Sequence, residues 1–297
     1  MDDFKIGDDF ENNGKQNKID RKIAIIIVIV VSIFFGLLVF FISNAIIGKN
    51  EKEPPKVDTQ VNLDDENVKI LYSYVAYKDN GYGNDKFLKE KSVTSNSFTN
   101  EDKLFYALQF VDPNDLVYDG QKTDQGQKIY NLSITKIKTY LQRFFGSDNS
   151  ISPVDEFEYK FDFSINGLSL AKLTYSEEEQ DYKVVFMKEE EKTEELVRPY
   201  YTKLSSATKK ADGTLILNEK VIYTTFVNEN DVYKINIYKD FEHTTLLEML
   251  QNIKKEDLIA KPISLEKYED KSATISYIFK INSINRNYYF DSSSITY

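Results

Sequence analysis

Residues Ile23 to Ile47 form a long, uninterrupted apolar run near the start of the chain. The run has 25 residues without a charge, and 19 of them are Ile, Val, Leu or Phe. At about 1.5 Å of rise per residue, such a helix measures roughly 37 Å and can cross a hydrocarbon core of ~30 Å. Buried helices of soluble proteins are rarely so long and so uniformly apolar. The pattern therefore predicts a single transmembrane helix over residues 23–47.

The residues at the two ends of this run indicate whether the segment is cleaved and how it is oriented in the membrane. Ser43-Asn44-Ala45 has the small-x-small form of a cleavage site, so removal of the segment after Ala45 is one alternative. A secretory signal usually has only about 7–15 apolar residues, which favours an uncleaved signal anchor. Arg21 and Lys22 directly precede the helix. The positive-inside rule then predicts a cytoplasmic N-terminus and a C-terminal domain outside the cell membrane.

Ser32 and Gly36 lie four residues apart within the apolar run. Two small residues at this spacing let two helix backbones approach closely in a membrane. The sequence therefore suggests a weak homodimer through Ser32 and Gly36.

The rest of the chain divides by composition. Residues 1–22 are polar without an apolar period, which indicates a disordered cytoplasmic tail. Residues 48–62 mix charges of both signs and contain two adjacent prolines, as is typical of a short, stiff juxtamembrane linker. Residues 63–297 have a globular pattern. We expect them to form one extracytoplasmic domain, or two that divide near the glutamate-rich stretch 189–199.

Four stretches of this domain carry apolar residues at helical spacings of three and four. The last combines Thr245 with Glu248 in the form of a capping box, so a helix is expected from Thr245 through Ile253. Asp64 and Asp65 precede the first stretch, and the N-capping residues expected for the other three are Thr99 or Asn100, Ser133, and Thr245. Their apolar positions are Val68, Leu71, Tyr72 and Val75; Leu104, Ala107, Leu108 and Val111; Ile134, Ile137, Leu141, Phe144 and Phe145; and Leu246, Leu250 and Ile253.

Strands follow the third of these helices. From Phe157 to Ile165, apolar residues alternate strictly with polar ones, which predicts a strand with one buried face. Asn166-Gly167 is a strong signal for a two-residue hairpin turn, and Asp212-Gly213 offers another. Further strands are expected at residues 168–175, 182–187, 200–211, 214–226, 232–238, 273–281 and 287–291.

Helices therefore come first, and antiparallel hairpins with one inserted helix come after them. This order predicts an α+β fold in which helices pack on a curved antiparallel β-sheet, and it argues against alternating helices on a parallel sheet. The layout resembles cystatin-like and NTF2-like architectures. That resemblance concerns the fold alone and implies no activity.

Composition removes several classes of chemistry. The chain has no Cys and one His, which excludes disulfides, thiolate nucleophiles, Cys-ligated zinc and sites that need two histidines. The net charge of −10 argues against nucleic-acid binding through phosphate neutralisation. Phosphate-binding glycine loops and the Gly-x-Ser-x-Gly elbow do not occur in the sequence. No cofactor is therefore expected.

An acidic loop after the second helix loosely resembles a calcium-binding loop. Leu116, however, stands where the EF-hand spacing requires an oxygen ligand, so the resemblance to that motif is incomplete. The residues of this loop are Asp112, Asn114, Asp115, Asp119 and Gly120.

Two further groups of side chains are candidates for catalysis. His243 precedes the expected fourth helix and would have to serve any Ser-His-Asp triad, although its position suits an ordinary loop histidine. A pair of carboxylates beside stacking aromatics is the requirement of a glycoside hydrolase. Acidic residues on or beside the alternating strand are of the right type for such a pair. The alternation, however, places them on the solvated face and not beside the aromatic side chains. They are Asp155, Glu156, Glu158 and Asp162.

The sequence thus assigns no catalytic, cofactor-binding or metal-binding residue. A spanning helix, a short tail and a large acidic domain favour a membrane-anchored, non-enzymatic binding or scaffolding module of a bacterial cell envelope. Its expected partners are the membrane and an envelope protein or glycan, and not nucleic acid. The alternative from another functional class is an envelope glycan hydrolase that uses a carboxylate pair.

Overall fold

The computed structural model describes residues 57–77, 85–146, 150–189 and 196–297. The chain divides into two compact units, residues 1–55 and 56–297, and the described residues belong to the second unit. The predicted tail, the apolar run 23–47 and the Ser32–Gly36 pair lie outside the described residues, and so do Ala45 and most of the linker. Among the described residues, no helix is long and apolar enough to span a bilayer.

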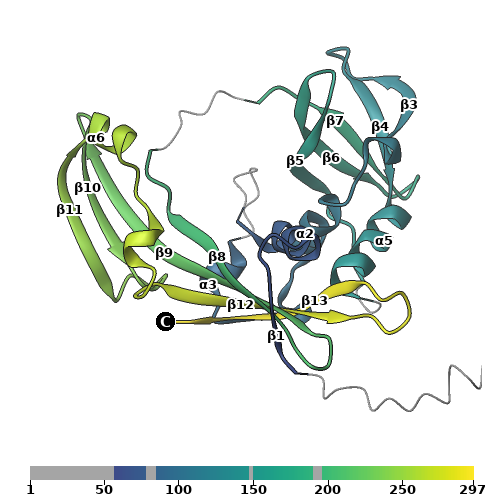
Figure 1. Cartoon of the computed structure of the whole chain (residues 1–297). Coiled ribbons are helices and arrows are strands. Elements are labelled where there is room, and N and C mark those ends of the chain that lie inside the picture. Colours follow the sequence, from purple (N-terminus) through teal and green to yellow (C-terminus); the bar gives the residue numbers. More distant parts are fainter. Residues whose placement is uncertain (1–56, 78–84, 147–149, 190–195) are drawn as a thin grey trace, which may run out of the picture. The chain divides into compact units, whose positions relative to one another are not determined.

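Within the described residues, the strands form two antiparallel sheets, one of eight strands and one of five (Figure 1). The larger sheet, sheet A, has the order β1-β8-β9-β12-β13-β2, and β10 pairs with β9 and with β11. Its strands are β1 (Thr59–Val61), β2 (Ser92–Thr94), β8 (Tyr200–Lys209), β9 (Leu215–Glu229), β10 (Val232–Tyr238), β11 (Leu246–Lys254), β12 (Ala273–Ile281) and β13 (Tyr288–Thr296).

The smaller sheet, sheet B, has the order β3-β4-β7-β6-β5. The predicted hairpin at Asn166-Gly167 joins its last two strands, and both turn residues have positive φ, as a type I′ turn requires. Its strands are β3 (Val117–Lys122), β4 (Lys128–Ser133), β5 (Glu156–Ile165), β6 (Leu168–Ser176) and β7 (Asp181–Phe186).

Three of the four predicted helices are confirmed, together with the predicted caps of the second and the third. Asp65 accepts hydrogen bonds from the first turn of α2 (Glu66–Val75), Thr99 forms a capping box with α4 (Asn100–Leu108), and Ser133 caps α5 (Ile134–Phe145). The remaining helical elements are α3 (Lys86–Lys89) and α6 (Lys255–Ala260), with the 3₁₀ turns η1 (Ser95–Ser97), η2 (Pro113–Asp115) and η3 (Leu265–Tyr268).

One large hydrophobic core contains side chains from both sheets and from the helices α2 to α5. Phe144 of α5 stacks on Phe290 of β13 with ring centroids 5.5 Å apart, while Phe105 of α4 meets Tyr159 of β5 at 5.7 Å. Helix α5 thus contacts sheet A, and helix α4 contacts sheet B. The aromatic residues that are abundant in the sequence largely fill this core.

A second, smaller core lies under the far end of sheet A. We call residues 224–254, which comprise the end of β9 with β10 and β11, the arm. Helix α6 and the turn η3 cover one face of the arm and close this core with Leu258, Leu265 and Tyr268. The buried strand residues there are Ile222, Tyr233, Ile235 and Ile237.

The prediction of a fourth helix from Thr245 through Ile253 is wrong, because Leu246–Lys254 is the strand β11. Two bulges interrupt its pairing with β10, and each inserts an extra residue into the period-two alternation. As a result, Leu247, Leu250 and Ile253 all pack against the arm core at a spacing of three. A bulged strand with this spacing resembles the apolar stripe of a helix.

The α+β class is confirmed in its coarse form, since the described chain consists mostly of antiparallel strands with a few helices. The expectation of one curved sheet is wrong, because the strands divide into two sheets that are not hydrogen-bonded to each other. Strands β3 and β4 precede α5 and belong to sheet B, so the order of helices first and hairpins afterwards also fails there.

Candidate functional site

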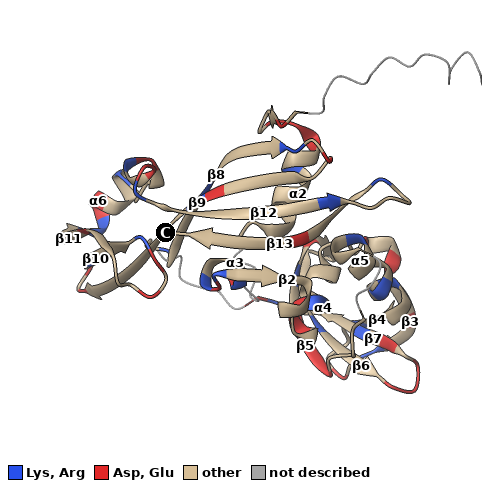
Figure 2. Ribbon diagram, turned by 90° about the horizontal axis from the view of Figure 1, so that it is seen from below, with Lys and Arg blue, Asp and Glu red and all other residues tan. Residues whose placement is uncertain are grey.

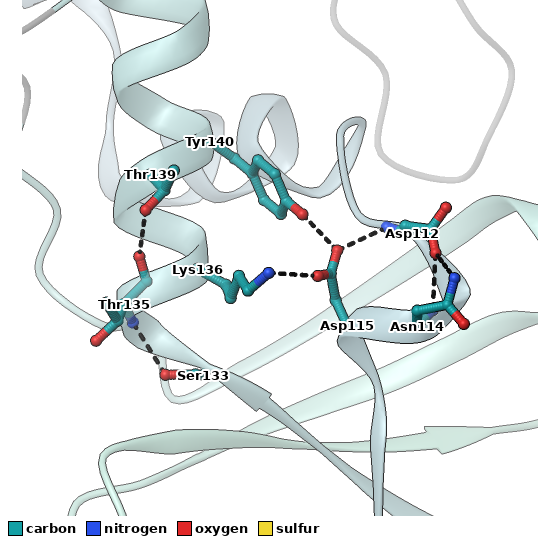
Figure 3. Close-up of polar contacts among 8 residues, drawn as sticks. All are labelled: Asp112, Asn114, Asp115, Ser133, Thr135, Lys136, Thr139 and Tyr140. Carbon is teal, nitrogen blue, oxygen red and sulfur yellow. Dashed lines mark hydrogen bonds and ion pairs between the residues drawn. The ribbon is translucent and has the colours of Figure 1, made fainter. Parts of the chain in front are cut away.

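The acidic loop that resembles a calcium site uses its carboxylates for internal bonds (Figure 3). Asp112 caps η2 by accepting from the backbone N–H of Asn114 at 2.8 Å and from its Nδ2 at 2.6 Å. Asp115 accepts from Lys136 Nζ at 2.8 Å and from the Tyr140 hydroxyl, which ties η2 to α5. Asp119 turns toward Gln121 N–H and Lys183 instead.

The electrostatics of this loop fit an anchoring role. Burial raises the pKa of Asp115, but hydrogen bonds from Lys136 and Tyr140 outweigh burial and hold the pKa below its ordinary value. Burial and the bond to Asp115 raise the pKa of Tyr140 to about 12. A cation at Asp115 would have to displace Lys136. Within the described part of the chain, no group of three or more acidic or His side chains is placed to hold a metal.

His243 lies on an exposed loop between β10 and β11. Its ring centroid is 4.7 Å from that of Tyr238, and its backbone N–H donates to the carbonyl of Asp240 at 3.1 Å. The buried carboxylate of Asp240 orders the loop by accepting from both backbone N–H groups of Thr244 and Thr245 at 2.8 Å. These contacts of His243 stabilise the conformation of the loop.

The carboxylates of the alternating strand lie where the alternation predicts. Glu156 and Glu158 are exposed on the outer face of β5, while the aromatic residues between them, Phe157 and Tyr159, are buried in the large core. Glu156 forms an ion pair with Lys172 across the sheet at 3.0 Å. The aromatic rings therefore face away from the carboxylates, and no carboxylate–aromatic cleft arises from this strand.

Besides Asp240, the described residues include a second buried acidic residue that we did not predict from the sequence. Glu219, in the middle of β9, is completely buried beneath α2. Its Oε2 accepts from the Tyr277 hydroxyl of β12 at 2.6 Å, and its Oε1 accepts from the Tyr72 hydroxyl of α2. Thr202 of β8 adds a third side-chain hydrogen bond. The carboxyl group thus joins three neighbouring strands to the helix above them.

Burial dominates the acidity of this cluster. It raises the pKa of Glu219 above its ordinary value, against the hydrogen bonds from Tyr277, Tyr72 and Thr202, which lower it. Burial, and then the nearby charge of Glu219, raise the pKa of Tyr277 well above its ordinary value. Such a carboxyl can hold a proton at a pH where a solvated glutamate cannot. Raised pKa values of this kind are a feature of catalytic acids and also of structural networks.

A signal for Glu219 is present in the sequence. It occupies one position of a strictly alternating series whose other members are all apolar or aromatic and all buried. An acidic residue in the inward register of a central strand must be neutral or fully hydrogen-bonded. The series is Leu215, Leu217, Glu219, Val221 and Tyr223.

The arm offers a different kind of surface. The face opposite the arm core, which we call the arm face, has large apolar side chains open to solvent. The exposed fractions are 56% for Val227, 38% for Val232, 48% for Leu246 and 43% for Met249. Strand pairing places the whole set on one face. The arm face comprises Thr225, Val227, Glu229, Val232, Lys234, Asn236, Tyr238, Leu246, Met249 and Lys254.

Two polar features accompany this face. The side-chain oxygen of Asn236 is buried between Thr225 and Met249, its partners in the strand register, and lacks a hydrogen-bond partner among the described residues. Strand β11 pairs only with β10 among the described strands, so its other edge is unpaired there. Exposed apolar side chains beside an open strand edge are the usual properties of a protein-binding surface.

In comparisons with known proteins, no family model, curated protein or solved structure matched this chain.

Proposed function

We propose that this protein is a single-pass, membrane-anchored module of a bacterial cell envelope that binds or scaffolds a protein partner and is not an enzyme. The apolar run 23–47 supports the anchor, and Arg21 and Lys22 support a cytoplasmic N-terminus. The domain that follows then lies outside the cell membrane. For each of the two sheets with the helices that pack on it, we propose a layout of the cystatin-like or NTF2-like kind, which implies no activity.

The observation that carries the binding function is the arm face. Four of its side chains are large, apolar and between 38% and 56% exposed. Burying exposed apolar surface contributes about 25 cal/mol per Å², so a partner that covers this face gains affinity from contacts that folding leaves unused. A protein partner fits better than a glycan, because Val, Leu and Met side chains offer no polar groups that orient a sugar.

The open edge of β11 suggests how such a partner is held. An extended segment that pairs with an edge strand forms backbone hydrogen bonds, while the neighbouring side chains select its sequence. Leu246 and Met249 stand on this strand and point to the arm face. The two bulges of β11 limit the length of strand that can be added, which protects the edge from unselective aggregation.

The hydrolase alternative would have to rely on Glu219, whose raised pKa suits a general acid. Both of its carboxyl oxygens, however, accept hydrogen bonds from tyrosines, and α2 covers it. A glycan could reach it only if α2 left the sheet. We therefore prefer binding to catalysis.

Site-specific photocrosslinking in intact cells tests the proposal. A photoreactive amino acid at Met249 should give a discrete crosslinked band, and the same amino acid at Glu158, on the solvated face of sheet B, should give none. The band should disappear when Leu246→Ser is added, since that change removes apolar contact without adding bulk. Equal crosslinking at both positions would contradict the arm as the binding surface.

Two further outcomes would contradict other parts of the proposal. Turnover of peptidoglycan by the purified chain that is lost in Glu219→Gln would show an enzyme. Survival of the C-terminal domain in cells treated with external protease, together with cleavage of an N-terminal tag, would show the opposite orientation in the membrane.

A further inference from the structure

The chain enters the folded unit beside the turn between β8 and β9. Strand β1 pairs with the end of β8, and the Asp58 carboxylate accepts from Lys210 Nζ at 2.7 Å and from the Ala211 backbone N–H at 3.1 Å. The first described residue, Val57, has 73% of its surface exposed. Residues 59–61 of the predicted linker 48–62 thus form β1, and this corner of sheet A is the first described part of the domain along the chain.

The hairpin between β12 and β13 reaches the same end of the sheet (Figure 2). The Tyr288 hydroxyl donates to the carbonyl of Gly213 in the β8–β9 turn at 3.3 Å. A Cβ placed on Gly213 would lie 3.0 Å from the Ile281 side chain, so the two hairpins are in direct contact. We call the two turns and the start of β1, residues 57–59, 209–214 and 280–291, the entry end.

An isoleucine forms the tip of the second hairpin. Ile284 is 89% exposed, although the loop that carries it is closed by its own hydrogen bonds. Asn282 Oδ1 accepts from the Ile284 backbone N–H at 2.9 Å, and the Asn282 carbonyl accepts from the Arg286 N–H at 2.9 Å. Folding of the described domain therefore buries little of the Ile284 side chain.

The charges of the entry end differ from those of the whole chain. Four basic and three acidic side chains lie there, whereas the chain as a whole has a net charge of −10. Asp58 and Asp291 pair with Lys210 and Lys280, which leaves Lys209 and Arg286 against Asp212 and a small positive excess. Apolar side chains flanked by basic ones are the composition that binds the boundary between lipid headgroups and acyl chains.

We propose that the β12–β13 hairpin inserts Ile284 into the headgroup layer of the membrane that holds the anchor, with Arg286 bound to lipid phosphates. This inference rests on the proposed membrane anchor. Val57 follows Ile47, the last residue of the apolar run, by ten residues, which span at most about 36 Å when fully extended. The linker is therefore short enough to let the entry end reach the bilayer, and insertion of the hairpin fixes which side of the domain faces the lipid.

The chain contains no Cys, so a single introduced Cys can be labelled without background. We would reconstitute the full chain as Ile284→Cys, labelled with an environment-sensitive fluorophore, in vesicles of phosphatidylethanolamine and phosphatidylglycerol. The matched control is Glu229→Cys, an exposed position at the end of the arm. Lipids with a spin label high on the acyl chain should quench the 284 label at least about twofold more than the 229 label.

Carbonate extraction of the same vesicles separates failure of this inference from failure of the anchor. If the chain stays in the membrane fraction but aqueous iodide quenches both labels equally, the hairpin does not insert and the inference is overturned while the anchor stands. If the chain is released into the carbonate supernatant, the anchor and the inference fall together. Retention in the membrane with selective lipid quenching at residue 284 supports both.

Discussion

One face of strand β9 is buried in the first half of the strand and exposed to solvent in the second half. From Leu215 to Tyr223, the residues of this face are buried beneath helices, and even Glu219 is fully enclosed. From Thr225 to Glu229, the same face is open, and Val227 is exposed. In the first half, which we call the core half, an acidic residue is buried and accepts hydrogen bonds from hydroxyl groups. In the second half, the arm half, an apolar residue is exposed to solvent.

The difference shows that burial follows from what covers a strand as well as from its own pattern. In the core half, α2 and α3 lie over the sheet, and the Tyr223 hydroxyl donates to the Leu88 carbonyl of α3 at 2.7 Å. Beyond Tyr223, helix α6 and η3 cover only the opposite face. The uncovered apolar face of the arm half can bind a partner. The packed core half of the same strand fixes the position of that face.

The largest effect should come from removing the buried acid. Glu219→Ala leaves the hydroxyls of Tyr72 and Tyr277 without their acceptor and opens a cavity, so the free energy of unfolding should fall by about 3–5 kcal/mol. Glu229→Ala changes the same residue type on the exposed end of the same strand and should change stability by less than about 0.5 kcal/mol. Urea denaturation of the full chain in detergent micelles, followed by near-ultraviolet circular dichroism, measures both. Equal effects would show that the two halves of β9 do not differ.

The second effect concerns pH. Because the pKa of Glu219 is raised in the folded state above its ordinary 4.5, the folded protein binds its proton more tightly than the unfolded chain does. This contribution to stability is fully present below that ordinary value and is lost as pH rises through the folded-state pKa. Glu219→Gln cannot titrate, so its stability should decline less than that of the wild type over this window. Parallel stability–pH curves for the two proteins would contradict a raised pKa.

A smaller effect, of the opposite sign, is expected in the arm. Asn236→Val removes a buried carbonyl oxygen that has no partner in the described structure and should raise the free energy of unfolding by about 1 kcal/mol. If the arm face binds a partner, the same variant should show weaker photocrosslinking from Met249. A loss of stability instead would mean that Asn236 is hydrogen-bonded within the folded chain.

The smallest effect on folding should come from the exposed apolar side chains themselves. Leu246→Ser and Met249→Ser should each change the melting temperature of the full chain little, corresponding to less than about 0.5 kcal/mol, because both side chains are already open to solvent. Leu217→Ser, on the covered half of β9, is the contrasting control and should destabilise strongly. A large loss from Leu246→Ser would mean that the arm face is covered in the folded protein.

The sequence was sufficient to predict those features of the structure that depend on residues close together in the chain. The caps at Thr99 and Ser133 and the turn at Asn166-Gly167 each arise within a few residues, and all three are confirmed. The carboxylates of β5 also lie on the face that the alternation predicts. Capping and turn geometry need no tertiary information, which explains this success.

The sequence was misleading where pairing partners decide the structure. Leu247, Leu250 and Ile253 have helical spacing only because two bulges interrupt β11, and those bulges arise from its register with β10. The division into two sheets likewise depends on which strands pair over long distances. The alternation places Glu219 in an inward register, but its hydroxyl donors Tyr72 and Tyr277 could not be predicted, because they are far from it in the chain.

The length of β9 has a mechanical consequence. Its 15 residues extend for about 50 Å, from the turn next to the chain entry to the tip of the arm. Strands β8 and β12 hold it with hydrogen bonds that run perpendicular to its axis. A pull along β9 therefore loads these bonds together in shear and does not peel them apart one after another. Tension between a bound partner and the membrane would act along the strands, which is the direction in which the sheet resists force best.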